Sequence, residues 1–156
     1  MTGPTDATGP IRSEWRDMDE DAAGTHAVGR AKMHEVYGFS VDPDTIEGPY
    51  VEVTVDHLFG TIWTREALDV RDRRLATIGV LAAQGMDSLL EVQFDAALER
   101  GELTEEQVRE LVLHLAHYVG WPRSSGANFA AEKIITKRRK AAEAAARPAD
   151  EPTRES

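Results

Sequence analysis

The chain has 156 residues, a length typical of one domain that can bury a hydrophobic core. Its 28 Asp and Glu residues outnumber its 18 Lys and Arg residues, and the net charge of -10 disfavours nucleic acids and anionic membranes as partners. Because the sequence contains no cysteine, disulfides, thiolate metal sites and cysteine nucleophiles are excluded. No apolar stretch reaches the roughly 20 residues needed to span a bilayer and no signal-peptide core is present, so we expect a cytoplasmic protein.

The two ends of the chain differ in composition from the middle. Residues 1–13 are rich in Gly, Pro and Thr and can bury too little apolar surface to offset their ordering entropy, which predicts a disordered N-terminal tail. Residues 141–156 predict a C-terminal tail. We therefore expect one helical domain over residues 14–140.

The N-terminal part of this domain mixes acidic residues and alanines with a few larger apolar side chains. From Glu14 to Tyr37 this pattern predicts one helix or two short ones, although Gly24 and Gly29 lower the helix propensity. Residues 41–49 contain two prolines, a glycine and three acidic residues, and they predict a connection.

The stretch from Tyr50 to Trp63 permits two interpretations. Its β-branched cluster around Val53 favours a strand by local propensity. However, several of its residues also fall on one face of a helix, and we predict a helix on this ground. The residues of that face are Tyr50, Val53, Thr54, His57, Leu58 and Thr61.

Two helices with recognisable ends follow. Asp69 can cap the first, which ends at Gly85, and Asp87 can cap the second, which runs to Gly101. The face shared by apolar residues of the first helix contains Arg71, Leu75, Ile78, Gly79 and Ala82.

A third helix has the clearest signals. Thr104 with Gln107 three residues later forms a capping-box pattern, and the helix should end at Gly120. Its apolar stripe consists of Val108, Leu111, Val112, Leu115 and Val119. After a loop with Pro122 and two serines, a last helix is expected from about Gly126, with Ala127, Ala130, Ala131 and Ile134 facing inward.

The second of these helices carries an amide on its apolar face. At about 100° per residue, Gln93 falls among Leu89, Leu90, Val92, Ala96 and Ala97. An unpaired buried amide costs about 1–3 kcal/mol, so Gln93 must either bond a neighbouring helix or line a cavity. Glu91, Asp95 and Glu99 recur every four residues on another side and predict a solvated stripe, and the basic run 137–140 predicts a solvated helix end.

His114 and Tyr118 lie one helical turn apart at the margin of the apolar stripe. An imidazole beside a phenol can transfer a proton or bind an oxyanion near neutral pH, so the pair is a candidate catalytic group. Alternatively, both side chains bond the backbone where two helices pack. His117 and Glu110 lie near His114, but a metal would need further ligands, and we expect none to bind.

Four other residues are candidates for substrate binding. Arg74 lies with two other arginines at the start of a helix, where cations oppose the helix dipole, so a nearby aspartate or a substrate carboxylate should compensate it. His57 and Trp63 occupy one segment, where a place in the core or in an interface is the alternative. Trp121 completes the set.

Three stretches of the sequence form a more specific pattern. They are RRLATIGVLAAQG from Arg73, AALERGELTEEQVRELVLHLAHYVGWP up to Pro122, and FGTIW, which ends at Trp63. These stretches resemble the carboxymuconolactone decarboxylase family, with a looser likeness over residues 27–136. The resemblance implies an all-α, AhpD-like fold with a central antiparallel helix pair, assembled into homo-oligomers, for which we expect trimers or hexamers.

The resemblance also distinguishes the branches of that family. The AhpD-like peroxidases use a Cys-x-x-Cys pair with a following histidine, but Met86 and Leu89 occupy the cysteine positions, so this branch is excluded. Gln93 matches the histidine, and an amide cannot act as a general acid or base as imidazole does. His114 and Tyr118 match the LILHxxxYxGxP motif of the decarboxylases, and the tryptophan of FGTIW matches theirs.

The implied function is that of a lyase that decarboxylates, without a cofactor, a carboxylated lactone or a related unsaturated ring acid in aromatic catabolism. Gln93 would donate to an oxyanion, His114 or Tyr118 would deliver a proton, and an arginine such as Arg74 would orient a carboxylate. The alternatives are an isomerase, dehydratase or cyclase that reuses the pocket, and a non-catalytic oligomeric binding protein. The enzymatic readings require Gln93 and His114 to face one enclosed cavity.

Overall fold

A computed structural model describes the backbone of residues 11–38 and 48–147, and side chains from residue 24 onward. Most of the connection predicted at 41–49 and the outer parts of both predicted tails lie outside the described residues. Throughout the described part the regular structure is helical and includes no β-strand, which confirms the all-α class. The chain divides into a first compact unit, residues 1–70, and a second, residues 71–156.

In the first unit, helix α1 (Ile11–Tyr37) packs against a π-helix, η1 (Thr54–Ile62), which directly follows the short helix α2 (Pro49–Val53). Two glycines allow a close approach. A Cβ atom at Gly29 would overlap the carbonyl oxygen of Val55, and one at Gly60 would lie 2.9 Å from the carbonyl oxygen of Thr25. Gly29, one of the two glycines that lower the helix propensity of α1, therefore allows the two helices to meet.

The helix predicted from Tyr50 to Trp63 is confirmed, but its buried face differs from the one proposed. Tyr50 and Val53 are 84% and 62% exposed, whereas Val55, Phe59 and Trp63 are buried. The buried residues recur every four positions and so share one side of the helix. Its π-helical turn is closed by the Trp63 N–H, which donates to the Leu58 carbonyl five residues earlier at 2.9 Å. The buried residues form the core of the first unit together with Met33 and Val36.

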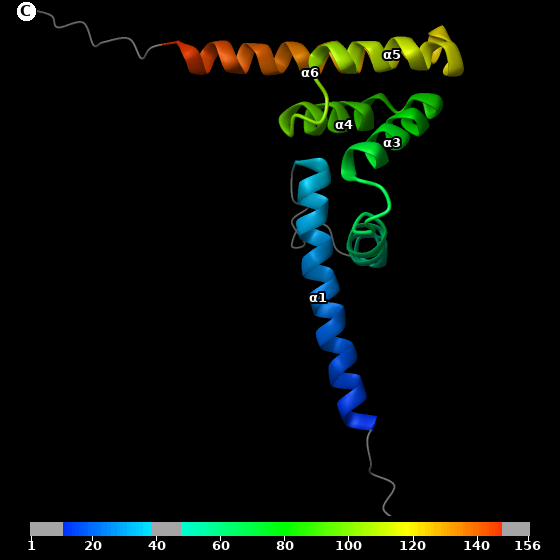
Figure 1. Ribbon diagram of the computed structural model, residues 1–156, viewed down its shortest axis with the longest axis vertical. Coiled ribbons are helices and arrows are strands. Elements are labelled where there is room, and N and C mark those ends of the chain that lie inside the picture. The colour runs from blue at the N-terminus through cyan, green and yellow to red at the C-terminus, as the bar shows by residue number, and fades with distance from the viewer. Residues whose placement is uncertain (1–10, 39–47, 148–156) are drawn as a thin grey trace, which may run out of the picture. The chain divides into compact units, whose positions relative to one another are not determined.

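The second unit contains helices α3 (Val70–Gln84), α4 (Asp87–Glu99), α5 (Glu105–Val119) and α6 (Trp121–Ala146), and α6 packs against both α4 and α5 (Figure 1). The predicted ends at Gly85, Gly101 and Gly120 are confirmed, since each has a positive φ that glycine adopts easily. The capping box of Thr104 and Gln107 is present with both of its hydrogen bonds.

Two local predictions in this unit are wrong. Asp87 forms no side-chain cap, and its carboxylate instead lies so close to Gly126 that a Cβ there would overlap it. Helix α6 begins at Trp121 rather than near Gly126, because Pro122 occupies the first turn, where its missing N–H leaves no helical hydrogen bond unmade. The inward residues predicted for this helix are buried, namely Ala127, Ala130, Ala131 and Ile134.

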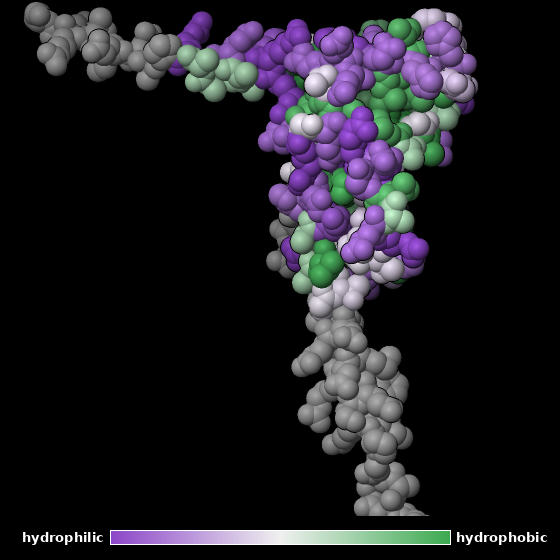
Figure 2. Space-filling view, in the orientation of Figure 1, coloured by the Kyte–Doolittle hydropathy of each residue, from purple (hydrophilic) through white to green (hydrophobic). Residues whose placement is uncertain are grey.

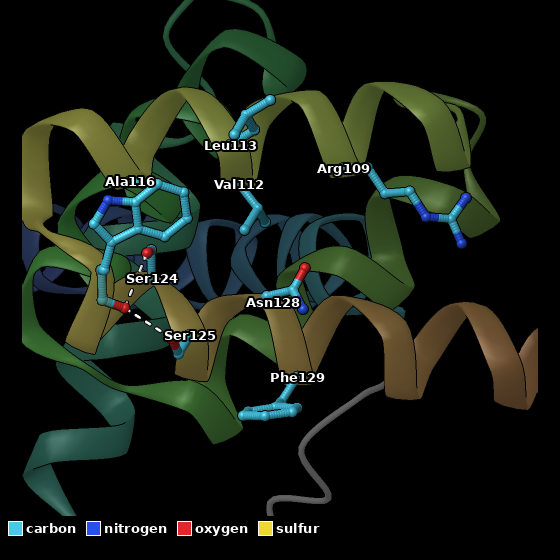
Figure 3. Close-up of a pocket in the computed structure, with 9 residues that line it drawn as sticks. Arg109, Val112, Leu113, Ala116, Ser124, Ser125, Asn128 and Phe129 are labelled. Atoms are coloured by element: carbon cyan, nitrogen blue, oxygen red, sulfur yellow. Dashed lines mark hydrogen bonds between the residues drawn. The ribbon is translucent and has the colours of Figure 1, made fainter.

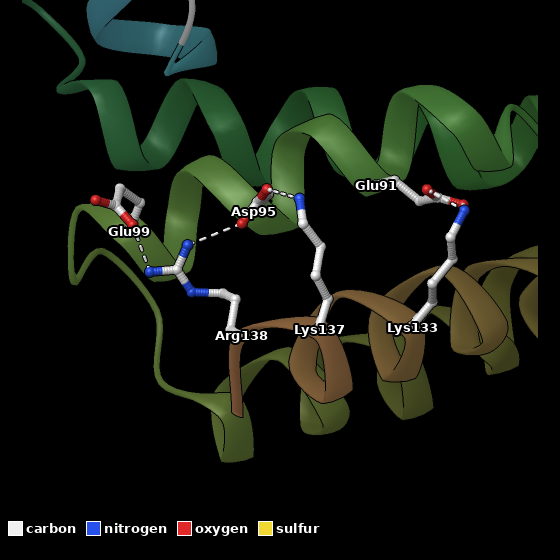
Figure 4. A network of polar contacts seen from close by, with 6 residues as sticks. All are labelled: Glu91, Asp95, Glu99, Lys133, Lys137 and Arg138. Carbon is white, nitrogen blue, oxygen red and sulfur yellow. Dashed lines mark hydrogen bonds and ion pairs between the residues drawn. The ribbon is translucent and has the colours of Figure 1, made fainter. Parts of the chain in front are cut away.

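The charged stretches predicted to face solvent are exposed or half-buried, and they are also paired between helices (Figure 4). Glu91 of α4 accepts from Lys133 of α6 at 2.7 Å, and Asp95 accepts from Arg138 at 2.8 Å. Further along, Arg138 also bonds Glu99, and Arg139 bonds Glu105. Since residues four apart lie on one helix face, the acidic stripe of α4 and the basic stripe of α6 form a ladder of ion pairs.

The ion pairs change the acidity of their carboxylates. Burial raises the pKa of Asp95, but hydrogen bonds from Arg138 and Lys137 outweigh it and hold the pKa below its usual range. Hydrogen bonds from Arg139 and Arg109 likewise lower the pKa values of Glu105 and Glu132. The charged forms of these carboxylates therefore stabilise the second unit.

The expected domain limits at residues 14 and 140 stay predictions. Helix α1 begins at Ile11 and helix α6 continues to Ala146. None of the helices in the described part is long and apolar enough to cross a membrane.

Candidate functional site

A buried polar cluster lies inside the second unit, where three segments contribute one side chain each. Arg74 of α3 is 1% exposed and Gln93 of α4 is 3% exposed. The Arg74 guanidinium donates from Nε and Nη2 to the two carboxylate oxygens of Glu102, at 2.6 and 3.1 Å, and from Nη1 to Gln93 Oε1 at 2.8 Å. The amide predicted on the apolar face of α4 is thus paired with a cation.

The position of each member follows from local structure. Arg74 lies one turn before the buried Ile78, so it extends the inward stripe of α3 and needs a partner there. Glu102 follows α4 in a turn closed by two hydrogen bonds, from the Gly101 N–H to the Leu98 carbonyl and from the Glu102 N–H to the Ala97 carbonyl. The turn that ends α4 at Gly101 therefore places the Glu102 carboxylate against the Arg74 guanidinium.

His114 and Tyr118 of α5 form a second feature of this unit. Their ring centroids are 4.9 Å apart with the planes tilted by 44°, so the predicted pair exists. Both side chains are exposed, Tyr118 by 75%. His117 points elsewhere and its Nδ1 lies 3.0 Å from the Leu113 carbonyl oxygen.

A pocket of about 280 Å³ opens between α5 and α6, and Trp121 belongs to its lining. Arg109 lies at one end and Ser124 and Ser125 at the other, with Asn128 between them (Figure 3). Neither Gln93 nor His114 lines this pocket, so it is not the enclosed cavity predicted to hold both.

The charges and hydroxyls of this pocket already have partners in the chain. Arg109 donates from Nε and Nη2 to Glu132 at 2.7 and 2.9 Å, and both serine hydroxyls donate to the Trp121 carbonyl oxygen. Its apolar lining is unusually accessible, with Trp121 and Phe129 66% and 74% exposed. Patches of hydrophobic surface also interrupt the hydrophilic face in Figure 2.

The two remaining candidate residues belong to the first unit. His57 is exposed on η1, whereas Trp63 is 9% exposed and stacks on Phe59 with ring centroids 6.2 Å apart. Trp63 therefore contributes to the core of that unit. The substrate-binding roles of both residues stay predictions.

The buried amide, the histidine and the tyrosine all fall inside one stretch that matches a known family. The sequence pattern described as "Carboxymuconolactone decarboxylase family" matches residues 49–133. The chain belongs to this family. The resemblance seen in the sequence is thereby confirmed, and with no cysteine in the chain the family's thiol chemistry is absent here.

Two curated relatives are similar to this member of the carboxymuconolactone decarboxylase family. The 4-carboxymuconolactone decarboxylase of Acinetobacter baylyi is 36% identical over 77 residues, which cover 49% of this chain and 57% of the relative. The nitrosuccinic acid decarboxylase npaB of Metarhizium robertsii is 34% identical over 87 residues, which cover 56% of this chain and 60% of the relative. The chain thus spans less than two thirds of either relative.

Glu102 is the residue of this cluster that the sequence analysis missed. Its local pattern, a glycine and an acid after a helix, is common and indicates only a helix end. The available signal was Arg74, a cation on the stripe of Ile78, which demands a buried carboxylate somewhere in the fold. Pattern alone does not say which of the 28 acidic residues supplies it.

Proposed function

We propose that the chain is a cofactor-independent carboxy-lyase that removes CO₂ from a small acid whose carboxyl group neighbours an electron acceptor. The observation that carries the proposal is the family match over residues 49–133, which contains Gln93, His114 and Tyr118. Both curated relatives are named as decarboxylases, one for a carboxylated lactone and one for a nitro acid. A carboxylated lactone or a related unsaturated ring acid is the substrate class that we favour.

The chemistry of such a reaction defines what the protein must supply. The bond between carbon and the carboxylate breaks, CO₂ leaves, and the electron pair passes into the acceptor, which becomes an oxyanion at the lactone or nitro oxygen. The carbon then takes up a proton. The protein therefore has to orient the acid, donate hydrogen bonds to the oxyanion and deliver one proton.

The proposed roles use groups of the second unit. The amide N–H of Gln93 donates to the oxyanion, since an amide supplies a hydrogen bond without taking part in proton transfer. His114 delivers the proton to carbon, with Tyr118 beside it as the second candidate donor. Because both rings are exposed in the single chain whereas Gln93 is buried, this proposal requires that assembly of the protein enclose one cavity that both Gln93 and His114 face. Trp121 of this unit remains a proposed contact of the substrate.

A homo-oligomer is part of this proposal. Tyr118, Trp121 and Phe129 are each at least 66% exposed in the single chain, and clustered exposed aromatic side chains are typical of surfaces that proteins bury on association. Association over this surface would also shield His114 from water. Sedimentation analysis of the purified chain distinguishes a trimer or hexamer from a monomer.

A second candidate function rests on the bonding of Gln93. The Gln93 oxygen accepts a hydrogen bond from Arg74 in the interior, which is also compatible with a purely structural role for this amide. The protein would then be an oligomeric binding protein, or an enzyme that isomerises, dehydrates or cyclises its substrate. Release of CO₂ separates the carboxy-lyase from all of these alternatives.

The test measures CO₂ release from 4-carboxymuconolactone and from nitrosuccinate with the purified chain. We expect turnover of at least one acid, and a loss of about 100-fold or more in His114→Gln, as is typical when a general acid is removed. His117→Gln is the matched control, since it changes an exposed histidine on the same helix. Turnover of neither acid, or equal rates in His114→Gln and the wild type, contradicts the proposal.

A further inference from the structure

We propose that Glu102 and Arg74 are positioning residues that fix the Gln93 carboxamide in one orientation, with its N–H end presented to the substrate oxyanion. This inference rests on the proposed function, and it replaces the carboxylate-binding role predicted for Arg74. It assigns a task to Glu102, for which the sequence pattern indicated none.

Only one end of the Gln93 carboxamide can face Arg74. A carboxamide has a donor end and an acceptor end that differ little in shape, so a buried glutamine can flip between two orientations. A guanidinium has only donors, so only the amide oxygen can lie against it. The contact of 2.8 Å between Arg74 Nη1 and Gln93 Oε1 therefore excludes the flipped orientation, and the N–H end points away from Arg74.

The Arg74 guanidinium is in turn held by Glu102. The planar guanidinium presents its donors in a rigid fork, and the carboxylate of Glu102 engages the edge formed by Nε and Nη2. This pairing leaves Nη1 directed at Gln93. A point charge such as lysine would not transmit an orientation in this way.

Glu102 is itself held by hydrogen bonds at its backbone. Its backbone N–H donates to the Ala97 carbonyl at 2.9 Å, and its own carbonyl oxygen accepts from Arg71 Nε at 3.1 Å. Both backbone polar groups and the carboxylate are thus fixed, and the side chain of Glu102 is only 13% exposed. The orientation of the amide is therefore set from the end of helix α4 itself.

The arrangement also strengthens the amide as a donor. A hydrogen bond from a cation to the amide oxygen polarises the carboxamide and makes its N–H groups better donors, while Glu102 keeps the cluster neutral overall. An oxyanion formed after loss of CO₂ would meet a polarised, pre-oriented donor instead of an amide free to turn its oxygen toward the negative charge.

The experiment uses two readouts, CO₂ release and binding of 3-nitropropionate nitronate, the anion that nitrosuccinate leaves when it loses CO₂. The Nε2 proton signals of Gln93 in the NMR spectrum, assigned by their loss in Gln93→Glu, report binding of the nitronate. The variants are Glu102→Gln, which weakens the grip on Arg74, and the double substitution Arg74→Met with Glu102→Leu, which removes both charges and so preserves folding. Asp95→Asn, a carboxylate-to-amide change on α4 outside the buried cluster, is the matched control.

We expect both test variants to lower kcat and nitronate affinity by about 10- to 100-fold, with a smaller change in KM, while Asp95→Asn stays within about twofold of the wild type. Equal nitronate affinity in the wild type and the two test variants, equal losses in Asp95→Asn, or no nitronate binding by the wild type would each overturn the inference. Nitronate binding that depends on Glu102, without CO₂ release from either acid, supports the positioning and contradicts the carboxy-lyase.

Discussion

The two units hold their helices together by different means. In the first unit, α1 and η1 meet backbone against backbone at Gly29 and Gly60, over a core of aromatic and β-branched side chains. In the second unit, an alanine- and isoleucine-rich core is flanked by a ladder of ion pairs from α4 to α6, and an ion pair lies in its interior at Arg74. The first unit also pairs polar groups between its helices, since His26 Nδ1 of α1 lies 2.7 Å from Asp56 Oδ1 of η1. Among the described residues, however, only the second unit buries a charged side chain, that of Arg74.

This difference bears on where polar chemistry is located. In the part of the chain that the structure describes, the buried polar side chains all belong to the second unit, which fixes them by hydrogen bonds. Among the described residues, no buried side-chain nitrogen or oxygen lacks a hydrogen-bond partner. The second unit can thus hold a buried amide and arginine at the cost of sensitivity to changes in charge.

The largest effect is expected from a single methyl group in the first unit. Gly29→Ala places a Cβ atom against the backbone of Val55, which cannot move like a side chain, so α1 and η1 must separate. We expect a loss of about 3 kcal/mol or more in the free energy of unfolding of this unit, measured by hydrogen exchange of the α1 and η1 amides.

Gly24→Ala is the control for this prediction, because a Cβ at that position meets nothing within 4 Å. The change should stabilise α1 by about 0.5–1 kcal/mol, as expected for alanine in an exposed helix. If both substitutions stabilised the unit, the close approach at Gly29 would not exist in solution.

A smaller effect is expected in the second unit on acidification. The pKa values of Asp95, Glu105 and Glu132 are lowered in the folded chain, so their contribution is present at neutral pH and is lost as the pH falls below about 5 and through the lowered values. Protection of α4 and α6 amides from exchange should therefore decrease between pH 7 and about pH 3.

Asp95→Asn sharpens this prediction. The substitution removes the charge that pairs with Arg138 and Lys137 while keeping the side-chain shape, and it should cost about 1 kcal/mol or less at neutral pH because the pair is partly exposed. The acid-induced loss in α4 and α6 should become smaller in the variant. An unchanged acid response would show that the Asp95 carboxylate contributes nothing to it.

The sequence predicted those parts of the fold that local chemistry determines. The capping box at Thr104 and the glycine ends of α3, α4 and α5 were found because their signals lie within a few residues. The start of α6 was missed because Pro122 suits a loop and a first helical turn equally well. The buried face of η1 was missed because apolar residues occupy both sides of this segment, and periodicity does not say which side faces the core.

The candidate site was predictable only in part for a related reason. Sequence placed Gln93 on an inward face and Arg74 near a required anion, and both side chains are buried. Their bond to each other joins residues 19 positions apart, and the bond to Glu102 spans 28 positions. Helical periodicity orders residues along one helix and carries no information about which residues of different helices meet.

The most direct test of the proposed mechanism is the rate of CO₂ release by Gln93→Glu beside the wild type. Glutamate retains an oxygen for Arg74 and nearly the same shape, but it replaces the amide N–H donor by a second acceptor. We predict a fall of about 100-fold or more in kcat, as when one oxyanion donor is removed, with the fold intact. A rate within about twofold of the wild type would contradict the assignment of Gln93 as the oxyanion donor.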